Sequence, residues 1–286
     1  MNNIIAFAHI PKTAGTTLVS ILRRSYGTRH FDRPGFYRPL TAEDLTQIRK
    51  IYRNLASLAG HTIQPHSDLH TQHPIRYYTF FRDPEKRLIS EFKFHVRRSA
   101  YDGKVHNNLI KTWNTWLPNR RNYQCKYISN EESAEKTIEV IQDRISFIGL
   151  LERFDESLIL LKKWANDPRL NIHYKTLNKG DGGSEHGRVT QTLIQEIDLF
   201  CKQLANDPSL NAQLTEAVSE DQKLYDYICS VLYPKQCSEY GQTLAQDTDQ
   251  FKKENQQIET KATETTGSKL FRDLIWKPAR PFLLPE

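Results

Sequence analysis

The sequence predicts an α/β fold in which a parallel β-sheet is flanked by helices on both faces. Three short apolar segments, residues 4–9, 77–81 and 146–151, each pass directly into a helical pattern. Strands that are separated by helices cannot pair through tight hairpins, so this alternation favours parallel strands joined by crossover helices. With 286 residues, the chain is long enough for one such domain with a substantial core.

The first strand–helix unit begins at the N-terminus. Ile4–His9 is a β-rich apolar run that opens into the loop Pro11–Thr17, PKTAGTT. Apolar residues then recur at helical spacing from Leu18 to Leu22, and Gly27 is a residue type that ends helices. The sequence therefore predicts a strand, a polar loop and a helix in direct succession.

Two later units repeat this pattern. Tyr77–Phe81 is typical of a buried strand, and Asp83 and Pro84 follow it as an N-cap and a first helical residue. The third unit leads from Ser146–Leu151 into the amphipathic stretch ERFDESLILLKKWA. Each helix thus begins just beyond the carboxyl end of a strand.

We divide the chain into a domain of residues 1–237, a flexible polar tail of residues 238–268 and an amphipathic segment of residues 269–286. The tail is rich in Gln, Thr, Glu, Asp and Lys, a composition that cannot supply a packed core. The final segment regains apolar residues. We leave open whether it docks on its own domain, on a partner or on a membrane surface.

Composition and charge narrow the partners only slightly. The formal net charge is +6 and the pI about 9.0, which suits anionic partners in general. The sequence has no clustered Lys/Arg stretch of the kind that indicates nucleic-acid binding. The four cysteines are not spaced as metal ligands usually are. The N-terminus resembles no signal peptide and no long apolar run occurs. We therefore expect a cytoplasmic protein without a transmembrane segment.

The loop Pro11–Thr17 has the chemistry of a phosphate-binding loop. Backbone N–H groups at a helix N-terminus are unpaired, and the helix dipole adds partial positive charge there. Gly15 allows close approach of a ligand, and Lys12 adds a full charge. The hydroxyl donors are Thr13, Thr16 and Thr17. This is not a Walker A motif, because Lys12 precedes the only glycine of the loop. The alternative is a Thr-capped helix start with a surface lysine.

Arg82 and Ser90 form a second group of polar residues. Arg82 lies where the second strand should end, and Ser90 lies about two helical turns beyond it. A guanidinium fork combined with a hydroxyl suits a phosphate monoester. Taken singly, Arg82 is equally compatible with a surface ion pair to Glu85, and Ser90 with an ordinary helix position.

Together, HIPKTAGTTL and FFRDPEKRLISEF resemble the two PAPS-binding signatures of the sulfotransferase superfamily. The form RDPxxRxxSxF resembles the carbohydrate branch that includes heparan sulfate 2-O-sulfotransferase and related bacterial proteins, and GLLERFDESL is also similar to it. The resemblance covers residues 4–235. It implies a P-loop-like fold that transfers a sulfuryl group from PAPS to an acceptor hydroxyl, with a carbohydrate favoured as acceptor. The resemblance also implies that 3′,5′-ADP is the second product and that no metal is required.

The same resemblance implies roles for individual residues. The residues that grip the 5′-phosphosulfate are Lys12, Thr13, Gly15, Thr16 and Thr17. Those that hold the 3′-phosphate are Arg82 and Ser90. A basic loop that closes over the nucleotide contains Lys175 and Thr176.

The candidate general base is His61. Members of the resembling branch often carry a Gly-His pair at this place in the chain, and an imidazole suits proton abstraction near neutral pH. The competing histidines are His66, His70 and His73. We expect His9 to pack beneath the phosphate-binding loop. Lys12 would absorb charge on the leaving phosphate.

Several residues, and the chain as a whole, have more than one possible interpretation. Trp113 and Trp116 are either an aromatic platform for a glycan or the core-facing side of a helix. Gln124 is a candidate for the acceptor cleft, and Glu152 for orienting a side chain there. For the whole chain, the alternatives are a catalytically inactive nucleotide-binding or interaction protein and a P-loop nucleotide kinase. The position of Lys12 and the lack of an evident magnesium-binding aspartate disfavour the kinase.

Overall fold

The computed structural model describes residues 3–33, 38–102, 108–174, 190–257, 266–279 and 284. They form a five-stranded parallel sheet in the order β2-β3-β1-β4-β5. The strands are β1 (Ile4–Ala8), β2 (His30–Arg33), β3 (Ser57–Gly60), β4 (Ile75–Phe81) and β5 (Ile145–Leu150). The predicted parallel sheet is confirmed. β2 and β3 were not among the predicted strands.

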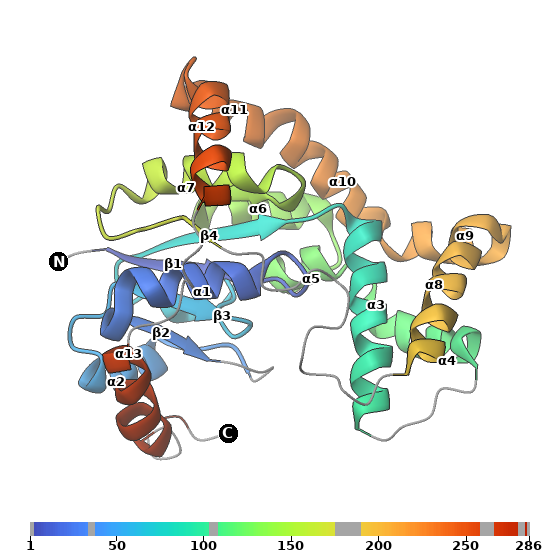
Figure 1. The fold of residues 1–286 in the computed structure, drawn as a ribbon, viewed down its shortest axis with the longest axis horizontal. Coiled ribbons are helices and arrows are strands. Elements are labelled where there is room, and N and C mark those ends of the chain that lie inside the picture. The colour runs from blue at the N-terminus through green and yellow to red at the C-terminus, as the bar shows by residue number, and fades with distance from the viewer. Residues whose placement is uncertain are drawn as a thin grey trace.

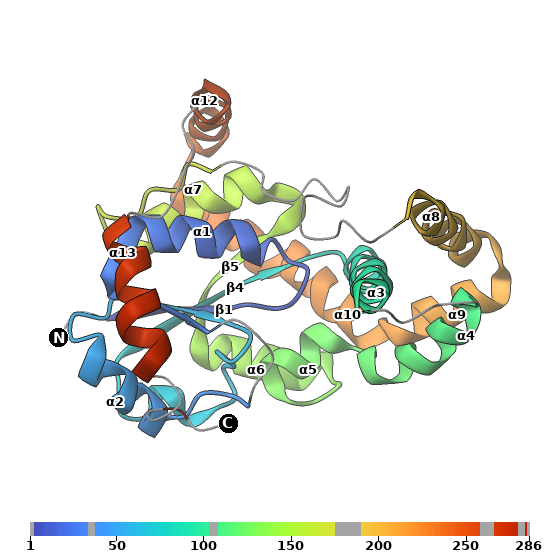
Figure 2. The ribbon, with the colours of Figure 1, turned by 60° about the horizontal axis from the view of Figure 1, so that its bottom comes forward.

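Helices connect the strands and extend beyond the sheet. In chain order they are α1 (Gly15–Tyr26), α2 (Ala42–Ile51), α3 (Pro84–Tyr101), α4 (Leu109–Trp116), α5 (Tyr123–Ser129), α6 (Ala134–Arg144), α7 (Phe154–Ala165), α8 (Gln191–Asn206), α9 (Pro208–Ala217), α10 (Ser219–Tyr227), α11 (Tyr233–Tyr240), α12 (Leu244–Gln257) and α13 (Thr266–Phe271). Figure 2 shows α1 and α7 on one face of the sheet and α5 and α6 on the other. The prediction of helices on both faces is confirmed.

The main hydrophobic core lies between the sheet and these helices. Ala6, Phe7 and Leu58 from the central strands are completely buried. Central strands of a parallel sheet are covered on both faces, so they need apolar residues throughout. A second core lies apart from the sheet, among α3, α4, α8 and α9 (Figure 1). Phe92 and Trp113 are at its centre, with ring centroids 5.1 Å apart.

The start of α3 follows the predicted local chemistry. The Asp83 side chain accepts a hydrogen bond from the backbone N–H of Lys86 at 2.9 Å, and Pro84 occupies the first helical turn. This cap fixes where the helix begins after β4. As a result, α3 stands just beyond the carboxyl ends of β1 and β4 (Figure 1).

The C-terminal part differs from the expected flexible tail. Within residues 238–268 the structure has α12, in which Leu244, Thr248 and Phe251 are buried. These positions lie four and three residues apart, so they share one face of the helix, and that face packs on α7. Further on, Trp276 is 3% exposed and packs edge-on against Phe31, at 4.9 Å between ring centroids. This part of the final segment therefore docks on its own domain.

The order of the strands creates a switch point between β1 and β4. The chain leaves β1 toward β2 on one side of the sheet, whereas it leaves β4 toward β5 on the other side. In open parallel sheets, ligands bind beyond the carboxyl ends of the two strands at such a point. We therefore expect a ligand site at the loops after β1 and β4.

Candidate active site

The loop between β1 and α1 is a tight turn. Lys12 and Ala14 have φ values of 71° and 66°, the left-handed region that L-residues rarely adopt. The Thr13 hydroxyl, completely buried, donates to the backbone oxygen of Ile10 at 2.8 Å. Ala14 is the N-cap of α1, and its methyl group cannot accept from the first N–H groups of the helix. These N–H groups thus remain donors for an anion, and Thr13 holds the turn.

Gly15 is required by the close approach of His9. A β-carbon at position 15 would lie 1.5 Å from Nε2 of His9. The His9 ring fills the space beneath the loop, as predicted, and burial lowers its pKa well below the ordinary value. A neutral His9 therefore supports the loop and adds no charge to it.

His61 lies beside this loop, directly after β3. Its Nδ1 is 2.7 Å from the backbone oxygen of His9, and the two imidazole rings stack with centroids 4.1 Å apart. A carbonyl oxygen can only accept, so Nδ1 carries the proton, and in the neutral ring Nε2 holds the lone pair. Burial lowers the pKa of His61, although the hydrogen bond to His9 and the charge of Glu91 raise it. The ring is thus held neutral and in one tautomer.

Arg82 connects the ends of β4 and β1. Its Nη1 donates to the backbone oxygen of Lys12 at 3.2 Å. The amide of Gln124 is completely buried and fixes the Arg82 backbone from behind. Its Oε1 accepts from Arg82 N at 3.2 Å, and its Nε2 donates to Arg82 O at 3.0 Å. Gln124 therefore holds the strand end and does not line a cleft, contrary to our expectation.

Glu152 steadies the same turn. Its Oε1 accepts from the backbone N–H of Asp83 at 3.1 Å, and its Oε2 accepts from the Tyr225 hydroxyl at 2.9 Å. Glu152 thus contacts one backbone group and one side chain, that of Tyr225. Together with Gln124, Glu152 fixes the direction in which Arg82 leaves the strand.

Lys12 and Arg82 are cations in need of a counterion. Burial lowers the pKa of Lys12, and the neighbouring Arg82 charge lowers it further. Among the residues that the structure describes, no carboxylate lies within ion-pair distance of either group. The Lys12 ammonium instead lies over the Phe94 ring, 4.6 Å from its centroid. Two adjacent half-buried cations without an ion pair fit an anionic ligand.

Glu91 is a site residue that the sequence did not reveal. It is 8% exposed, and its carboxylate accepts from Nη1 of Arg87 at 2.6 Å and lies 3.4 Å from Nε of Arg120. Its charge also raises the pKa values of Lys12 and His61. Glu91 thus couples the two groups electrostatically from α3. Its local pattern is that of an ordinary i,i+4 ion pair with Arg87 on α3, which does not reveal that Lys12 and His61 approach it from other elements.

The structure describes some of the other residues that we predicted to bind the sulfate donor, but not all of them. Thr16 is exposed and Thr17 half-buried in the first turn of α1, and Ser90 is half-buried in α3, next to Glu91. The structure thus brings the two predicted groups to the same edge of the sheet. Lys175 and Thr176 lie outside the described residues.

The rival histidines do not gather at this edge. His70 packs against Tyr77, near the amino end of β4, and His73 bonds to Thr46 and Arg49 of α2. His66 lies against the backbone of α5. Of the histidines that we considered as the base, His61 alone stands next to the loop of Lys12.

The two tryptophans are core residues. Trp113 is completely buried and Trp116 is 8% exposed, both within the second core. The interpretation of a core-facing helix is therefore confirmed, and that of an exposed aromatic platform is wrong. Phe92 and Phe200 supply the rings that enclose Trp113.

The fold and the site define an α/β protein with two half-buried cationic side chains, Lys12 and Arg82, at the switch point of its parallel sheet. A model of the sulfotransferase family matches residues 2–228. This match covers most of the chain, and the chain therefore belongs to the sulfotransferase family. Membership indicates a transferase that moves a sulfuryl group. No curated protein matches the chain.

Within the described ranges, no helix is long and apolar enough to cross a membrane. The same residues contain no group of three or more His, Cys, Asp or Glu side chains that could hold a metal ion.

Proposed function

We propose that this protein transfers the sulfuryl group of PAPS to an acceptor hydroxyl, on a carbohydrate, and releases 3′,5′-ADP. The observation that carries the proposal is the cluster at the switch point. There, Arg82 donates to the backbone oxygen of Lys12 at 3.2 Å, and Nδ1 of His61 is hydrogen-bonded at 2.7 Å to the backbone oxygen of His9, directly after β1. The cluster thus contains cations for an anionic donor and a neutral base.

In this reaction the acceptor oxygen forms a bond to sulfur while the bond between sulfur and the phosphate oxygen breaks. His61 takes the hydroxyl proton on Nε2, since Nδ1 already donates to His9. The electron pair of the broken bond stays on the 5′-phosphate of the product. Lys12 and the N-terminal N–H groups of α1 stabilise that charge.

The donor-binding residues divide by their position. The loop after β1 would hold the 5′-phosphosulfate through Lys12, the backbone of Thr13 and Gly15, and the hydroxyls of Thr16 and Thr17. Across the switch point, Arg82 and Ser90 would hold the 3′-phosphate. Lys175 and Thr176 are proposed to close over the nucleotide, on the strength of the family resemblance.

The choice of a carbohydrate acceptor is supported by the block from Arg82 to Phe92, RDPEKRLISEF, which resembles the carbohydrate branch of the family. A glycan hydroxyl is a weak acid, so its attack on sulfur needs a base held close to it. His61, beside the Lys12 loop, is in a position to be that base.

The test combines binding and transfer on the full chain. We expect 3′,5′-ADP to bind and 5′-AMP to bind far more weakly, because only the former carries the phosphate assigned to Arg82. With radiolabelled PAPS and a panel of polysaccharides, glycolipids, small metabolites and tyrosine peptides, we expect transfer to a carbohydrate. His61→Ala should retain 3′,5′-ADP binding but lose transfer by about 10²–10⁴-fold, the usual contribution of a general base.

The matched control is His73→Ala, which removes an imidazole at the amino end of β4 and should leave transfer unchanged. Transfer that survives in His61→Ala would remove this residue from the mechanism. Binding of 3′,5′-ADP without transfer to any acceptor would favour an inactive nucleotide-binding protein. Phosphoryl transfer from ATP would favour a nucleotide kinase.

A further inference from the structure

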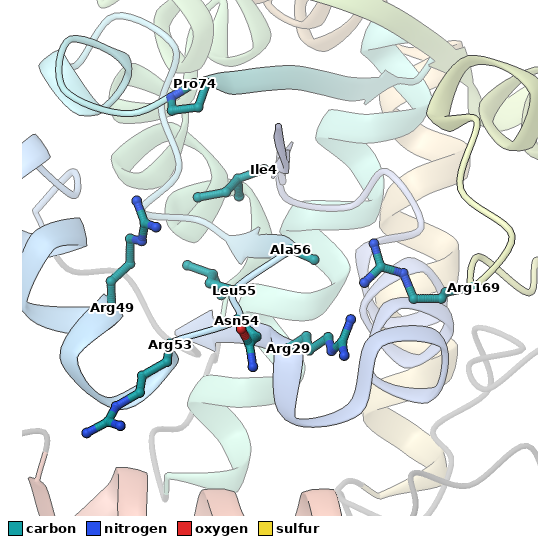
Figure 3. Close-up of a pocket in the computed structure, with 9 residues that line it drawn as sticks. All are labelled: Ile4, Arg29, Arg49, Arg53, Asn54, Leu55, Ala56, Pro74 and Arg169. Carbon is teal, nitrogen blue, oxygen red and sulfur yellow. The ribbon is translucent and has the colours of Figure 1, made fainter. Parts of the chain in front are cut away.

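A second cationic site lies at the opposite edge of the sheet. A hollow of about 210 Å³ opens at the amino ends of β1, β3 and β4. Its apolar floor consists of Ile4, Leu55, Ala56 and Pro74, and its polar wall of Arg29, Arg49, Arg53, Asn54 and Arg169. Figure 3 shows Arg49 on one side of this floor, Arg29 and Arg169 on the other, and Arg53 turned outward at the rim.

This hollow is separate from the candidate active site. Lys12, His61 and Arg82 follow the carboxyl ends of the same three strands whose amino ends border the hollow. β4 has seven residues, and a strand advances about 3.3 Å per residue, so about 20 Å of buried sheet lies between the two edges. A donor bound at the switch point therefore does not extend into the hollow.

The hollow has an excess of positive charge. None of its nine lining residues is acidic. Arg169 pairs with Asp167 at 2.6 Å, whereas Nη1 of Arg49 bonds at 3.1 Å to His73, an imidazole. Within the described part of the chain, no carboxylate pairs with Arg29 or Arg53, and both side chains are exposed. Guanidinium groups stay charged at all relevant pH values, so an anion at this place would relieve their mutual repulsion.

The size and the apolar floor of the hollow indicate that the anionic group belongs to a larger organic molecule. At about 30 Å³ for each water molecule, the hollow would hold about seven waters, which is more than a bare sulfate or phosphate needs. Ile4 and Leu55 offer a buried apolar surface on which the C–H face of a ring can pack, and the Asn54 amide can bond to a hydroxyl. The opening between the arginines would then receive the charged group.

We propose that this hollow binds a sulfate or phosphate ester of a small organic body such as a sugar, independently of the donor site. Arg29 and Arg49 hold the ester oxygens through charged hydrogen bonds, and the organic body lies on the floor formed by Ile4 and Leu55. The inference does not depend on the proposed sulfuryl transfer, because it concerns the other edge of the sheet.

The experiment measures binding of glucose 6-sulfate, glucose 6-phosphate, glucose and inorganic phosphate to the full chain by calorimetry. The donor site is first saturated with 3′,5′-ADP, or removed by Lys12→Ala if 3′,5′-ADP does not bind. We expect both esters to bind at one saturable site, with glucose and inorganic phosphate binding at least tenfold more weakly.

The double variant Arg29→Gln/Arg49→Gln should weaken ester binding at least tenfold and leave the thermal midpoint unchanged or raised. The matched control is Arg98→Gln, since Arg98 is 58% exposed on α3, far from the hollow, and pairs with Asp102. Equal affinity in the double variant and the control would overturn the site. Inorganic phosphate that binds as tightly as the esters would overturn the requirement for an organic body. Esters that bind no better than glucose would overturn the requirement for the charged group.

Discussion

Replacing Gly15 with alanine should destabilise the protein, although alanine favours helices. The added β-carbon would lie 1.5 Å from Nε2, 2.0 Å from Cε1 and 2.1 Å from Cδ2 of His9. Ordinary van der Waals contact begins at 3.4 Å, so the imidazole or the loop must retreat by about 1.9 Å. The His9 ring has little room to do so, because it stacks on Phe7 at 5.3 Å and on His61 at 4.1 Å.

The magnitude follows from two opposing effects. Forcing extra volume into a packed site costs about 1–3 kcal/mol, whereas alanine in place of glycine in a helix gains about 0.5–1 kcal/mol. The net loss is about 1–2 kcal/mol, which corresponds to a fall in Tm of about 2–8 °C for a chain of this size. Because the displaced ring pushes on His61, transfer should fall more than stability alone would explain.

The assay is thermal unfolding of Gly15→Ala beside Gly267→Ala, which adds the same methyl group in α13 where nothing lies within 4 Å. The control should leave Tm unchanged or slightly raised. In the double variant Gly15→Ala/His9→Ala, the second change should cost less than it does in wild type, because the clash has gone. The reasoning is refuted if Gly15→Ala matches the control, or if the two changes are simply additive.

Three other outcomes are expected. In a pH profile of kcat/KM, the acid limb should have its midpoint below pH 6.5, because burial lowers the pKa of His61 and the base acts only when neutral. A midpoint above pH 6.5 would contradict the assignment of His61 as the base. Glu91→Gln should shift that limb to lower pH, since loss of a negative charge disfavours the imidazolium, and should lower Tm because the buried Arg87 loses its ion pair. Trp276→Ala should release the C-terminal segment from Phe31, seen as faster proteolysis of residues 266–279, while the midpoint of the main domain changes little.

The elements that the sequence predicted well are those set by local chemistry. The pair Asp83 and Pro84 specifies the start of α3 by a cap and a fixed φ, whatever the rest of the fold does. Ile4–Ala8 is apolar throughout and Tyr77–Phe81 is aromatic apart from Thr79, because both segments are buried in the centre of the sheet. In both cases the residues of the element itself are enough to predict its secondary structure.

The missed elements owe their burial to partners elsewhere. β2, of sequence HFDR, has four residues and is buried although it is polar, because Asp32 bonds to Arg23 of α1 at 2.8 Å. β3, of sequence SLAG, is short and built of small residues. For α12 a weak signal did exist, since Leu244, Thr248 and Phe251 have helical spacing within a polar composition.

The site residues follow the same division. Lys12 and Arg82 are recognisable because each follows an apolar strand. Gln124 acts through the backbone of Arg82, which is distant in the chain. Glu91 pairs with Arg87 in its own helix, but the site groups whose pKa values it raises, Lys12 and His61, are distant in the chain. Gln124, for example, contacts the backbone 42 residues before it. A polar helix residue of this kind has no sequence pattern that separates it from a solvent-exposed one.

The meeting of Lys12, His61 and Arg82 is a consequence of strand order. β3 and β4 flank β1, and neighbouring strands lie about 4.8 Å apart, so the loops after β3 and β4 begin about 10 Å from one another with the Lys12 loop between them. In the proposed reaction this spacing has a chemical meaning. A donor centred on Lys12 would have its sulfuryl group on the side of His61, the base. Its 3′-phosphate would lie on the side of the Arg82 guanidinium. A base on the β4 side would compete with the nucleotide for space, which is a physical reason to prefer the histidine after β3.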